Sequence, residues 1–227
     1  MLKKFVLFLA FAIAFPAIAS AQYFVAGTFQ GWQPGDSAYE MTDQGGGLFT
    51  FTATGLDANS LQEFKVTSGD WPDPNWPAGN VTGRAGSDGS MTFRFWEGPN
   101  NVGFESDFVS DWSIIGQPGY GWGNWETGTD GPQLSHLGDQ VYSVSFTPLQ
   151  TGVAEFKFRN TGNWDNEQFG PDGGKDGNIS FEVLSLVEHT FSIDTKNGTF
   201  SITAIPEPAT ALMLIMGLAG LVCHRRR

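Results

Sequence analysis

The segment Glu63-Phe64-Lys65-Val66, with Trp71 and Trp76 after it, decides the fold because the chain contains a second copy of it. The second copy is Glu155-Phe156-Lys157-Phe158, followed by Trp164 and Phe169. The flanking segments 48–53 and 88–93 also correspond to 141–146 and 176–181, so the repeat has a period of about 90 residues. Solenoid repeats are usually about 20 to 50 residues long. The period therefore predicts two tandem small domains.

Apolar and polar residues alternate in most segments between turns. Phe49 and Phe51 alternate with threonines, and Phe156 and Phe158 alternate with charged residues. A period of two places one set of side chains in a core and the other set outside it. The 30 glycines of the chain occur mainly in turn-forming clusters that separate these short segments. We therefore predict an all-β protein with two β-sandwich modules, 22–108 and 109–205.

The amino terminus has the order of a secretory signal peptide. It begins with Lys3 and Lys4, continues with an apolar run over 5–18, and reaches the small-x-small sequence Ala19-Ser20-Ala21. We predict removal of residues 1–21 by signal peptidase, so that the mature chain starts at Gln22.

The carboxyl terminus combines three features in a fixed order. Pro206, Glu207 and Pro208 precede an apolar run over 209–223, and Arg225, Arg226 and Arg227 end the chain. Segment 206–227 resembles the PEP-CTERM tail of exported bacterial proteins. The resemblance implies processing by an exosortase near the Pro-Glu-Pro sequence. Together with the positive-inside tendency, it predicts a single transmembrane sorting helix in the inner membrane and a mature form at the cell surface or in the extracellular matrix, either released or anchored again.

The exported part of the chain is strongly acidic. Of the 12 Lys and Arg residues, five lie in 1–21 and 209–227, so that residues 22–208 have seven against 24 acidic residues, a net charge of seven minus 24, or −17. This charge disfavours binding to nucleic acid phosphates. The one cysteine, Cys223, lies in the tail, and therefore each module must be stable without a disulfide.

The duplicated Lys/Trp set suggests a binding surface. Since Phe64 and Val66 point into the core, Lys65 points away from it, and tryptophans follow in a turn-rich loop. Indole rings stack on the apolar faces of sugar rings, and lysine and asparagine bind their hydroxyls. Each tryptophan could instead close the open end of a sandwich. The candidate carbohydrate-binding residues are Trp32, Lys65, Trp71, Trp76, Trp122, Trp125, Lys157, Trp164 and Asn166.

A second resemblance rests on these residues. Segment 23–32, which ends Gln30-Gly31-Trp32, together with Glu63-Phe64-Lys65-Val66 and Trp71, resembles the starch- and glycogen-binding immunoglobulin-like modules of the family-48 type. Segments 114–122 and 155–164 are similar to the repeated domains of SusE-type starch-binding lipoproteins. The resemblance implies two tandem immunoglobulin-like β-sandwiches. Gln30 replaces the usual Asn, which leaves the identity of the sugar open.

Catalytic and metal-binding patterns are sparse. The exported part has only His136 and His189, with no Ser/His/Asp pattern and no cysteine nucleophile. Segment 172–178 is either a solvated acidic turn or a loop around a calcium ion. We predict no enzyme activity, no cofactor and no metal site.

These features predict an exported, non-catalytic protein that binds a polysaccharide or oligosaccharide. The alternative is a structural matrix or adhesion protein without a specific small ligand.

Overall fold

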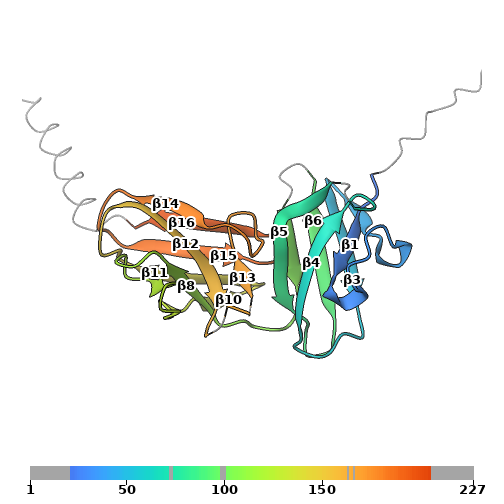
Figure 1. Cartoon of the computed structure of the whole chain (residues 1–227), viewed down its shortest axis with the longest axis horizontal. Coiled ribbons are helices and arrows are strands. Elements are labelled where there is room, and N and C mark those ends of the chain that lie inside the picture. The colour runs from blue at the N-terminus through green and yellow to red at the C-terminus, as the bar shows by residue number, and fades with distance from the viewer. Residues whose placement is uncertain (1–20, 72–73, 98–100, 163, 166, 206–227) are drawn as a thin grey trace, which may run out of the picture.

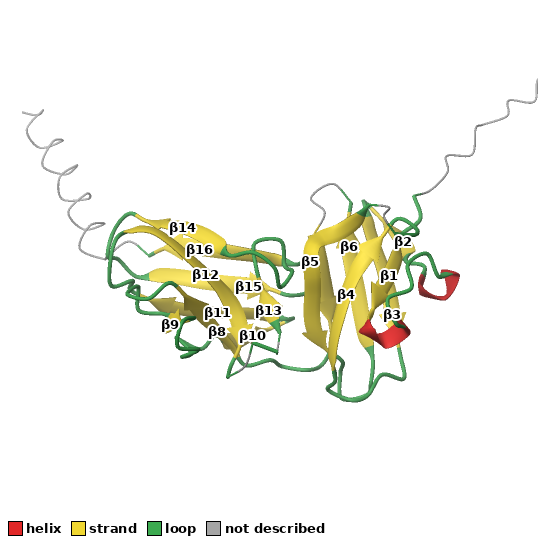
Figure 2. Cartoon of the chain, in the orientation of Figure 1, coloured by secondary structure: helices red, strands yellow, loops and turns green. Residues whose placement is uncertain are grey.

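The structure is a computed structural model that describes residues 21–71, 74–97, 101–162, 164–165 and 167–205. These residues form 16 β-strands and two short 3-10 helices, Thr28–Gln30 and Ser37–Tyr39 (Figure 2). The strands fall into two groups along the chain (Figure 1). We call residues 21–105 the N-terminal half and residues 112–205 the C-terminal half.

The N-terminal half has two antiparallel sheets with strand orders β1-β4-β5 and β2-β3-β6-β7. The repeated Glu-Phe-Lys-Val segment lies in β4, which pairs with β1 on one side and β5 on the other. The strands are β1 (Phe24–Gly27), β2 (Thr42–Gly45), β3 (Leu48–Ala53), β4 (Leu61–Thr67), β5 (Asn75–Arg84), β6 (Met91–Trp96) and β7 (Asn101–Glu105).

The C-terminal half also has two sheets. One has the order β13-β12-β8-β9 with β14 also paired to β12, and the other has the order β10-β11-β15-β16. The second copy of the repeat lies in β12. The strands are β8 (Trp112–Gly116), β9 (Gly123–Asn124), β10 (Ser135–Gly138), β11 (Val141–Phe146), β12 (Gly152–Asn160), β13 (Gln168–Phe169), β14 (Ile179–Val183), β15 (His189–Asp194) and β16 (Thr199–Ala204).

Each half has its own aromatic core, formed by side chains from both of its sheets. In the N-terminal half, Phe64 of β4 meets Phe93 of β6 edge to face, with ring centroids 4.6 Å apart. In the C-terminal half, Phe156 of β12 lies 5.6 Å from Phe191 of β15. The corresponding phenylalanines of the two copies, Phe64 and Phe156, are both fully buried. The period-two pattern therefore correctly predicts the inward side chains of these strands.

The all-β prediction is confirmed, whereas the prediction of two tandem immunoglobulin-like β-sandwich domains is wrong. An immunoglobulin domain places strands A, B, E and D in one sheet and C, F and G in the other. In the N-terminal half the first, fourth and fifth strands form one sheet, and the second, third, sixth and seventh form the other. In number and size, the four sheets resemble the blades of a four-bladed β-propeller. Alternation predicts which side chains are buried but not which strands pair, and the error follows from that limit.

The predicted transmembrane helix also requires correction. In the described ranges, no helix is long and apolar enough to cross a membrane. The segment on which that prediction rests, 206–227, and the predicted signal peptide up to residue 20 lie outside the described residues.

Alanine substitutions at a buried and at an exposed position of β12 should lower the free energy of unfolding by different amounts. Phe156→Ala should lower the free energy of unfolding by about 3–5 kcal/mol, because it removes a fully buried ring and leaves a cavity. Val153→Ala on the same strand is the control, since Val153 is 63% exposed and its loss should change stability by less than about 0.5 kcal/mol. Denaturant unfolding of both variants measures the difference. Equal losses would contradict the packing described for Phe156.

Candidate functional site

Two of the candidate tryptophans, Trp32 and Trp71, come together in the N-terminal half. Trp71 is 43% exposed, and its indole Nε1 donates a hydrogen bond to the backbone oxygen of Trp32 at 3.4 Å. Trp32 has a φ of 60°, directly after Gly31 with a φ of 72°. A bulky residue in the left-handed region is uncommon, and such conformations cluster at functional sites. The two loops therefore present a Trp71 ring that is open to a ligand.

Trp164 occupies the corresponding loop of the C-terminal half and is 38% exposed. The guanidinium of Arg159 lies over its ring, 4.6 Å from the centroid. Arg159 is itself 1% exposed, donates to the backbone oxygen of Gly128 at 3.1 Å, and forms an ion pair with Asp130. Trp164 thus covers a buried cation while part of its surface remains accessible.

Two other candidates, Trp76 and Trp122, pack against the hydrophobic cores. Trp76 lies 5.0 Å from Phe95 and 5.7 Å from Tyr23, measured between ring centroids. Trp122 is 7% exposed and lies 5.2 Å from Phe156. Both rings contribute to the apolar core of their half.

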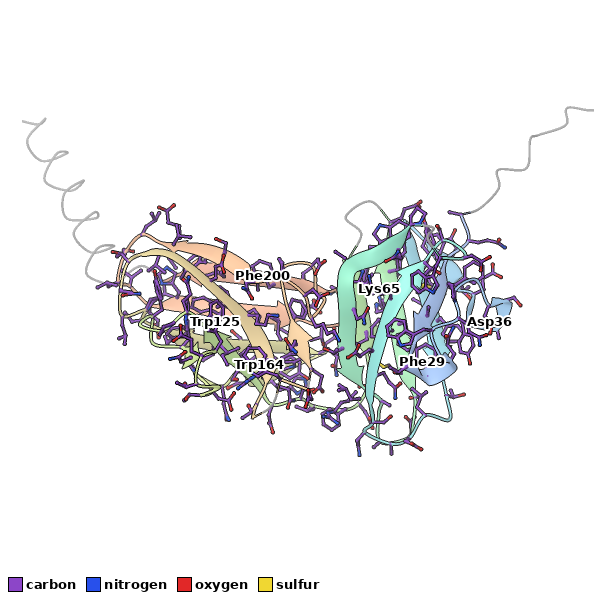
Figure 3. The ribbon with its side chains drawn as sticks, in the orientation of Figure 1. Phe29, Asp36, Lys65, Trp125, Trp164 and Phe200 are labelled. Carbon is purple, nitrogen blue, oxygen red and sulfur yellow. The ribbon has the colours of Figure 1, made fainter. Side chains whose placement is uncertain are left out.

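Trp125 borders a surface pocket of about 400 Å³ in the C-terminal half. Its other walls carry the ring of Tyr120 and the polar side chains of Gln117, Glu126 and Gln150. The Tyr120 hydroxyl is occupied, because it donates to the backbone oxygen of Val153 at 3.1 Å. A half-buried indole beside amide and carboxylate groups is a suitable surface for a polar ring. Figure 3 shows Trp125 and Trp164 on the C-terminal half and Lys65 on the N-terminal half.

The two candidate lysines lie at the junction between the halves. Lys65 Nζ donates to Asn75 Oδ1 at 3.0 Å and to the backbone oxygen of Ala78 at 2.6 Å. Lys157 Nζ donates to Gln168 Oε1 at 3.3 Å and to the backbone oxygen of Lys175 at 2.6 Å. Burial lowers the pKa of both lysines, and the charge of Asp176 opposes this effect at each. Both ammonium groups therefore have protein partners.

The loop 172–178 of the C-terminal half contacts the N-terminal half. Lys175 Nζ forms an ion pair with Glu63 Oε1 at 2.7 Å, and its backbone nitrogen donates to Asn80 O at 2.7 Å. Asp172 accepts hydrogen bonds from the backbone nitrogens of Gly174 at 3.1 Å and Ala78 at 3.3 Å. Within the described ranges, no group of three or more His, Cys, Asp or Glu side chains could hold a metal ion. Lys175 and Asp172 of this loop thus contact the N-terminal half.

A buried ion pair reinforces the junction. Arg84 Nε of β5 lies 3.2 Å from Glu167 Oε1, and the Glu167 side chain is fully buried. Beside it, Gln168 N donates to Thr82 Oγ1 at 2.8 Å, and Thr82 Oγ1 donates to Gln168 O at 3.2 Å. The sequence pattern does not predict this contact. Alternation identifies the outward side chains of β5 and does not tell whether water or another domain lies outside them.

The remaining predicted residues are not part of the described structure. Asn166 lies outside the described residues, as do Pro206, Glu207, Pro208, Arg225, Arg226 and Arg227. Their predicted roles stay predictions from the sequence.

Comparison with known proteins identifies the tail. The family model of the PEP-CTERM protein-sorting motif matches residues 204–227. The match confirms the predicted sorting tail and indicates an exported protein that is sorted through an exosortase to the cell surface or the extracellular space.

The rest of the chain has distant similarity only. No curated protein matches the chain. Among solved structures, the crystal structure of SusF from Bacteroides thetaiotaomicron is similar at 17% sequence identity with a TM-score of 0.33. The match covers 85% of this chain and 50% of that chain, so this chain spans half the length of the SusF structure.

The Glu63–Lys175 pair predicts a pH-dependent contribution to stability. Burial raises the pKa of Glu63, but hydrogen bonds from Lys175 and Asn80 outweigh this and hold it below its usual value of 4.5. A lowered pKa in the folded state means that the pair stabilises the fold above pH 4.5, and that this contribution is lost as the pH falls through the lowered pKa.

Glu63→Gln should therefore destabilise the protein by less than about 1 kcal/mol at pH 7, as expected for a partly exposed pair. At a pH below the lowered pKa, the variant and the wild type should be equally stable. Glu155→Gln is the control, because the corresponding Glu155 is exposed and its carboxylate accepts a hydrogen bond only from the Asn178 side chain among the contacts described. A Glu63→Gln effect that is the same at both pH values would contradict the ion pair.

Proposed function

We propose that this exported protein is a non-catalytic carbohydrate-binding protein whose ligand is a polysaccharide or an oligosaccharide. One observation carries the proposal. Trp71 and Trp164 follow the repeated Phe-Lys strand at nearly the same distance in the two halves, and both are more than a third exposed. An exposed indole costs solubility and contributes little to a core, so its recurrence at corresponding positions supports a role in binding.

The other candidate residues divide into two groups under this proposal. Trp32 and Trp125 are half-buried and are grouped with Trp71 and Trp164, because the backbone oxygen of Trp32 accepts from Trp71 and Trp125 borders a pocket with amide side chains. Lys65 donates to β5, and Lys157 donates to β13 and to the loop 172–178, so both ammonium groups support the junction and not the sugar. The sugar is therefore bound chiefly by stacking, with hydrogen bonds from loop side chains.

Two weak sites on one chain bind a polymer more tightly than either site alone. The second contact is made at an effective concentration in the millimolar range for short linkers. The hydrogen bonds and ion pairs at the junction limit the movement of one half against the other. Such an arrangement favours a polymer over a single sugar.

A structural role in the extracellular matrix is the second candidate function. The observation that favours it is the junction itself, where both lysines of the repeated motif bond to protein groups. A matrix protein made of two closely packed units needs no ligand site.

Sedimentation of the exported body with insoluble polysaccharides distinguishes the two functions. Residues 22–205 should be retained on insoluble starch, on immobilised glycogen, or on the producer's own exopolysaccharide. Absence of retention on all three would support the structural role and contradict the carbohydrate-binding proposal.

Trp71→Ala should weaken polysaccharide binding by about 1 to 3 kcal/mol, by analogy with stacking of nucleobases on aromatic rings. Its thermal transition should stay near that of the wild type, because Trp71 is exposed. Leu184→Ala is the matched control, since Leu184 is 78% exposed and belongs to no candidate site. Trp164→Phe tests the second site while keeping a ring over Arg159. Unchanged affinity in both tryptophan variants would contradict the proposal.

The sorting tail gives an independent prediction. The two prolines of Pro206-Glu207-Pro208 disfavour a regular helix, and the segment should therefore be accessible to the exosortase. Replacing the three residues with alanine should block processing, so that the full-length chain accumulates in the cell. Mass spectrometry of the extracellular wild type should find a carboxyl terminus upstream of Arg227. An extracellular form that retains Arg227 would show that the tail is not removed.

A further inference from the structure

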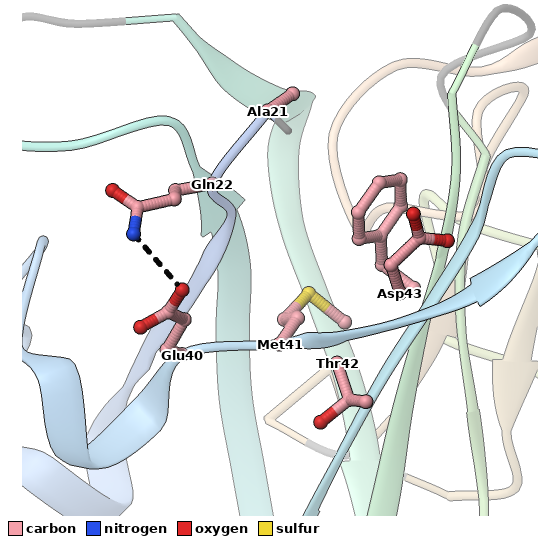
Figure 4. Close-up of a pocket in the computed structure, with 7 residues that line it drawn as sticks. Ala21, Gln22, Glu40, Met41, Thr42 and Asp43 are labelled. Carbon is pink, nitrogen blue, oxygen red and sulfur yellow. Dashed lines mark hydrogen bonds between the residues drawn. The ribbon is translucent and has the colours of Figure 1, made fainter. Parts of the chain in front are cut away.

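A pocket of about 550 Å³ lies beside the first described residues (Figure 4). Its walls include Ala21, Gln22, Glu40 and Asp43. The Gln22 side chain reaches toward Glu40, and its Nε2 donates a hydrogen bond to Glu40 Oε1 at 3.1 Å. Glu40 and Gln22 are both exposed, so this carboxamide is in contact with water as well as with a carboxylate.

The core fixes the chain immediately after Gln22. Tyr23 is 6% exposed, its hydroxyl donates to Glu97 Oε1 at 2.7 Å, and its backbone oxygen accepts from Met41 N at 2.7 Å. Cleavage after Ala21, which the signal-peptide pattern predicts, leaves one residue before this anchored tyrosine. Cleavage further along would remove Tyr23 from its contacts with Phe49 and Phe95.

We infer that Gln22 is the amino-terminal residue of the mature protein and is converted there to pyroglutamate, with Glu40 assisting the reaction. The α-amine of Gln22 attacks its own side-chain carbon Cδ, a bond forms between the α-nitrogen and Cδ, and the Cδ–Nε2 bond breaks. The Nε2 nitrogen leaves as ammonia. The reaction is intramolecular and needs no oxidant, reductant or second substrate.

Glu40 is placed for proton transfer in this reaction. The attacking α-ammonium must lose a proton, and the leaving Nε2 must gain one. The Glu40 carboxylate already contacts Nε2, and Glu40 and Gln22 line the same pocket, so in the inferred reaction Glu40 accepts the first proton and delivers the second. Positioned acid–base groups accelerate reactions by about 10² to 10⁴-fold. An exposed carboxylate should give an effect near or below the lower end, about tenfold.

The product has two consequences for an exported protein. The positive α-ammonium disappears, so the mature chain becomes more acidic by one charge. The lactam also has no free α-amine, and enzymes that degrade proteins from a free amino terminus therefore have no starting point.

The full-length precursor, expressed in an exporting bacterial host, tests the inference. Mass spectrometry of the amino-terminal peptide of the exported protein should show a peptide that begins at residue 22 with a mass lower by one ammonia. The time course of this mass loss in pulse-labelled exported protein gives the rate. We expect Glu40→Gln to cyclise about tenfold more slowly than the wild type.

Asp43→Asn is the matched control. Asp43 lines the same pocket, but its Oδ1 accepts from the backbone nitrogen of Gly45 at 2.7 Å. This variant should keep the wild-type rate, and the wild-type protein held in urea should show the slow rate of an unassisted terminus. A different first residue or an uncyclised Gln22 would overturn the inference. Equal rates for wild type, Glu40→Gln and the urea-unfolded chain would overturn the role of Glu40.

Discussion

The contact on which the arrangement of the two halves depends is the ion pair between Arg84 and Glu167. The Glu167 side chain is fully buried, and a buried carboxylate without a cationic partner is strongly destabilising. Its Oε1 accepts from Ser110 Oγ at 2.8 Å and contacts Arg84, whereas Oε2 has no hydrogen-bond partner among the described residues. The cation, Arg84, belongs to the N-terminal half. The buried Glu167 carboxylate of the C-terminal half therefore has this cationic partner only when the two halves are in contact.

This constraint extends along β5. Thr82 and Gln168 exchange hydrogen bonds next to the ion pair, Asn80 accepts from Lys175, and Ala78 donates to Asp172. One strand of the N-terminal half therefore binds both β13 and the loop 172–178 of the other half. In the same loop, the backbone oxygen of Lys175 accepts a hydrogen bond from the Lys157 ammonium. The Lys65 ammonium donates to the backbone oxygen of Ala78 in β5. The Phe-Lys motif thus connects each core to the junction, which explains how two small aromatic cores hold one relative orientation.

The sequence predicts the inside of each half better than the outside. Alternation correctly assigns Phe64, Phe156 and Phe158 to cores, because water is excluded from one face of β4 and β12 at these positions. It does not give the strand pairing, and the immunoglobulin-like prediction is wrong for that reason. It also assigns Lys157 to the outer face without indicating that β13 and a loop cover it; the side chain is 8% exposed. Trp76 and Trp122 show the same limit: the structure places Trp76 in β5 and Trp122 in a loop, and both rings pack on a core.

Glycine is the signal in the sequence that could have revealed the junction. Gly79 lies within β5, and a Cβ atom there would lie 2.5 Å from Cβ of Asp176 in the other half. Gly103 in β7 faces the opposite half in the same way, against the backbone oxygen of Lys196, and Gly198, in the turn before β16 with a φ of 64°, lies against the backbone oxygen of Val102. A glycine within a strand weakens the strand, so its presence often indicates that another backbone approaches closely. Because these glycines belong to both halves, each half has surface positions where only the absence of a side chain lets the other half approach so closely.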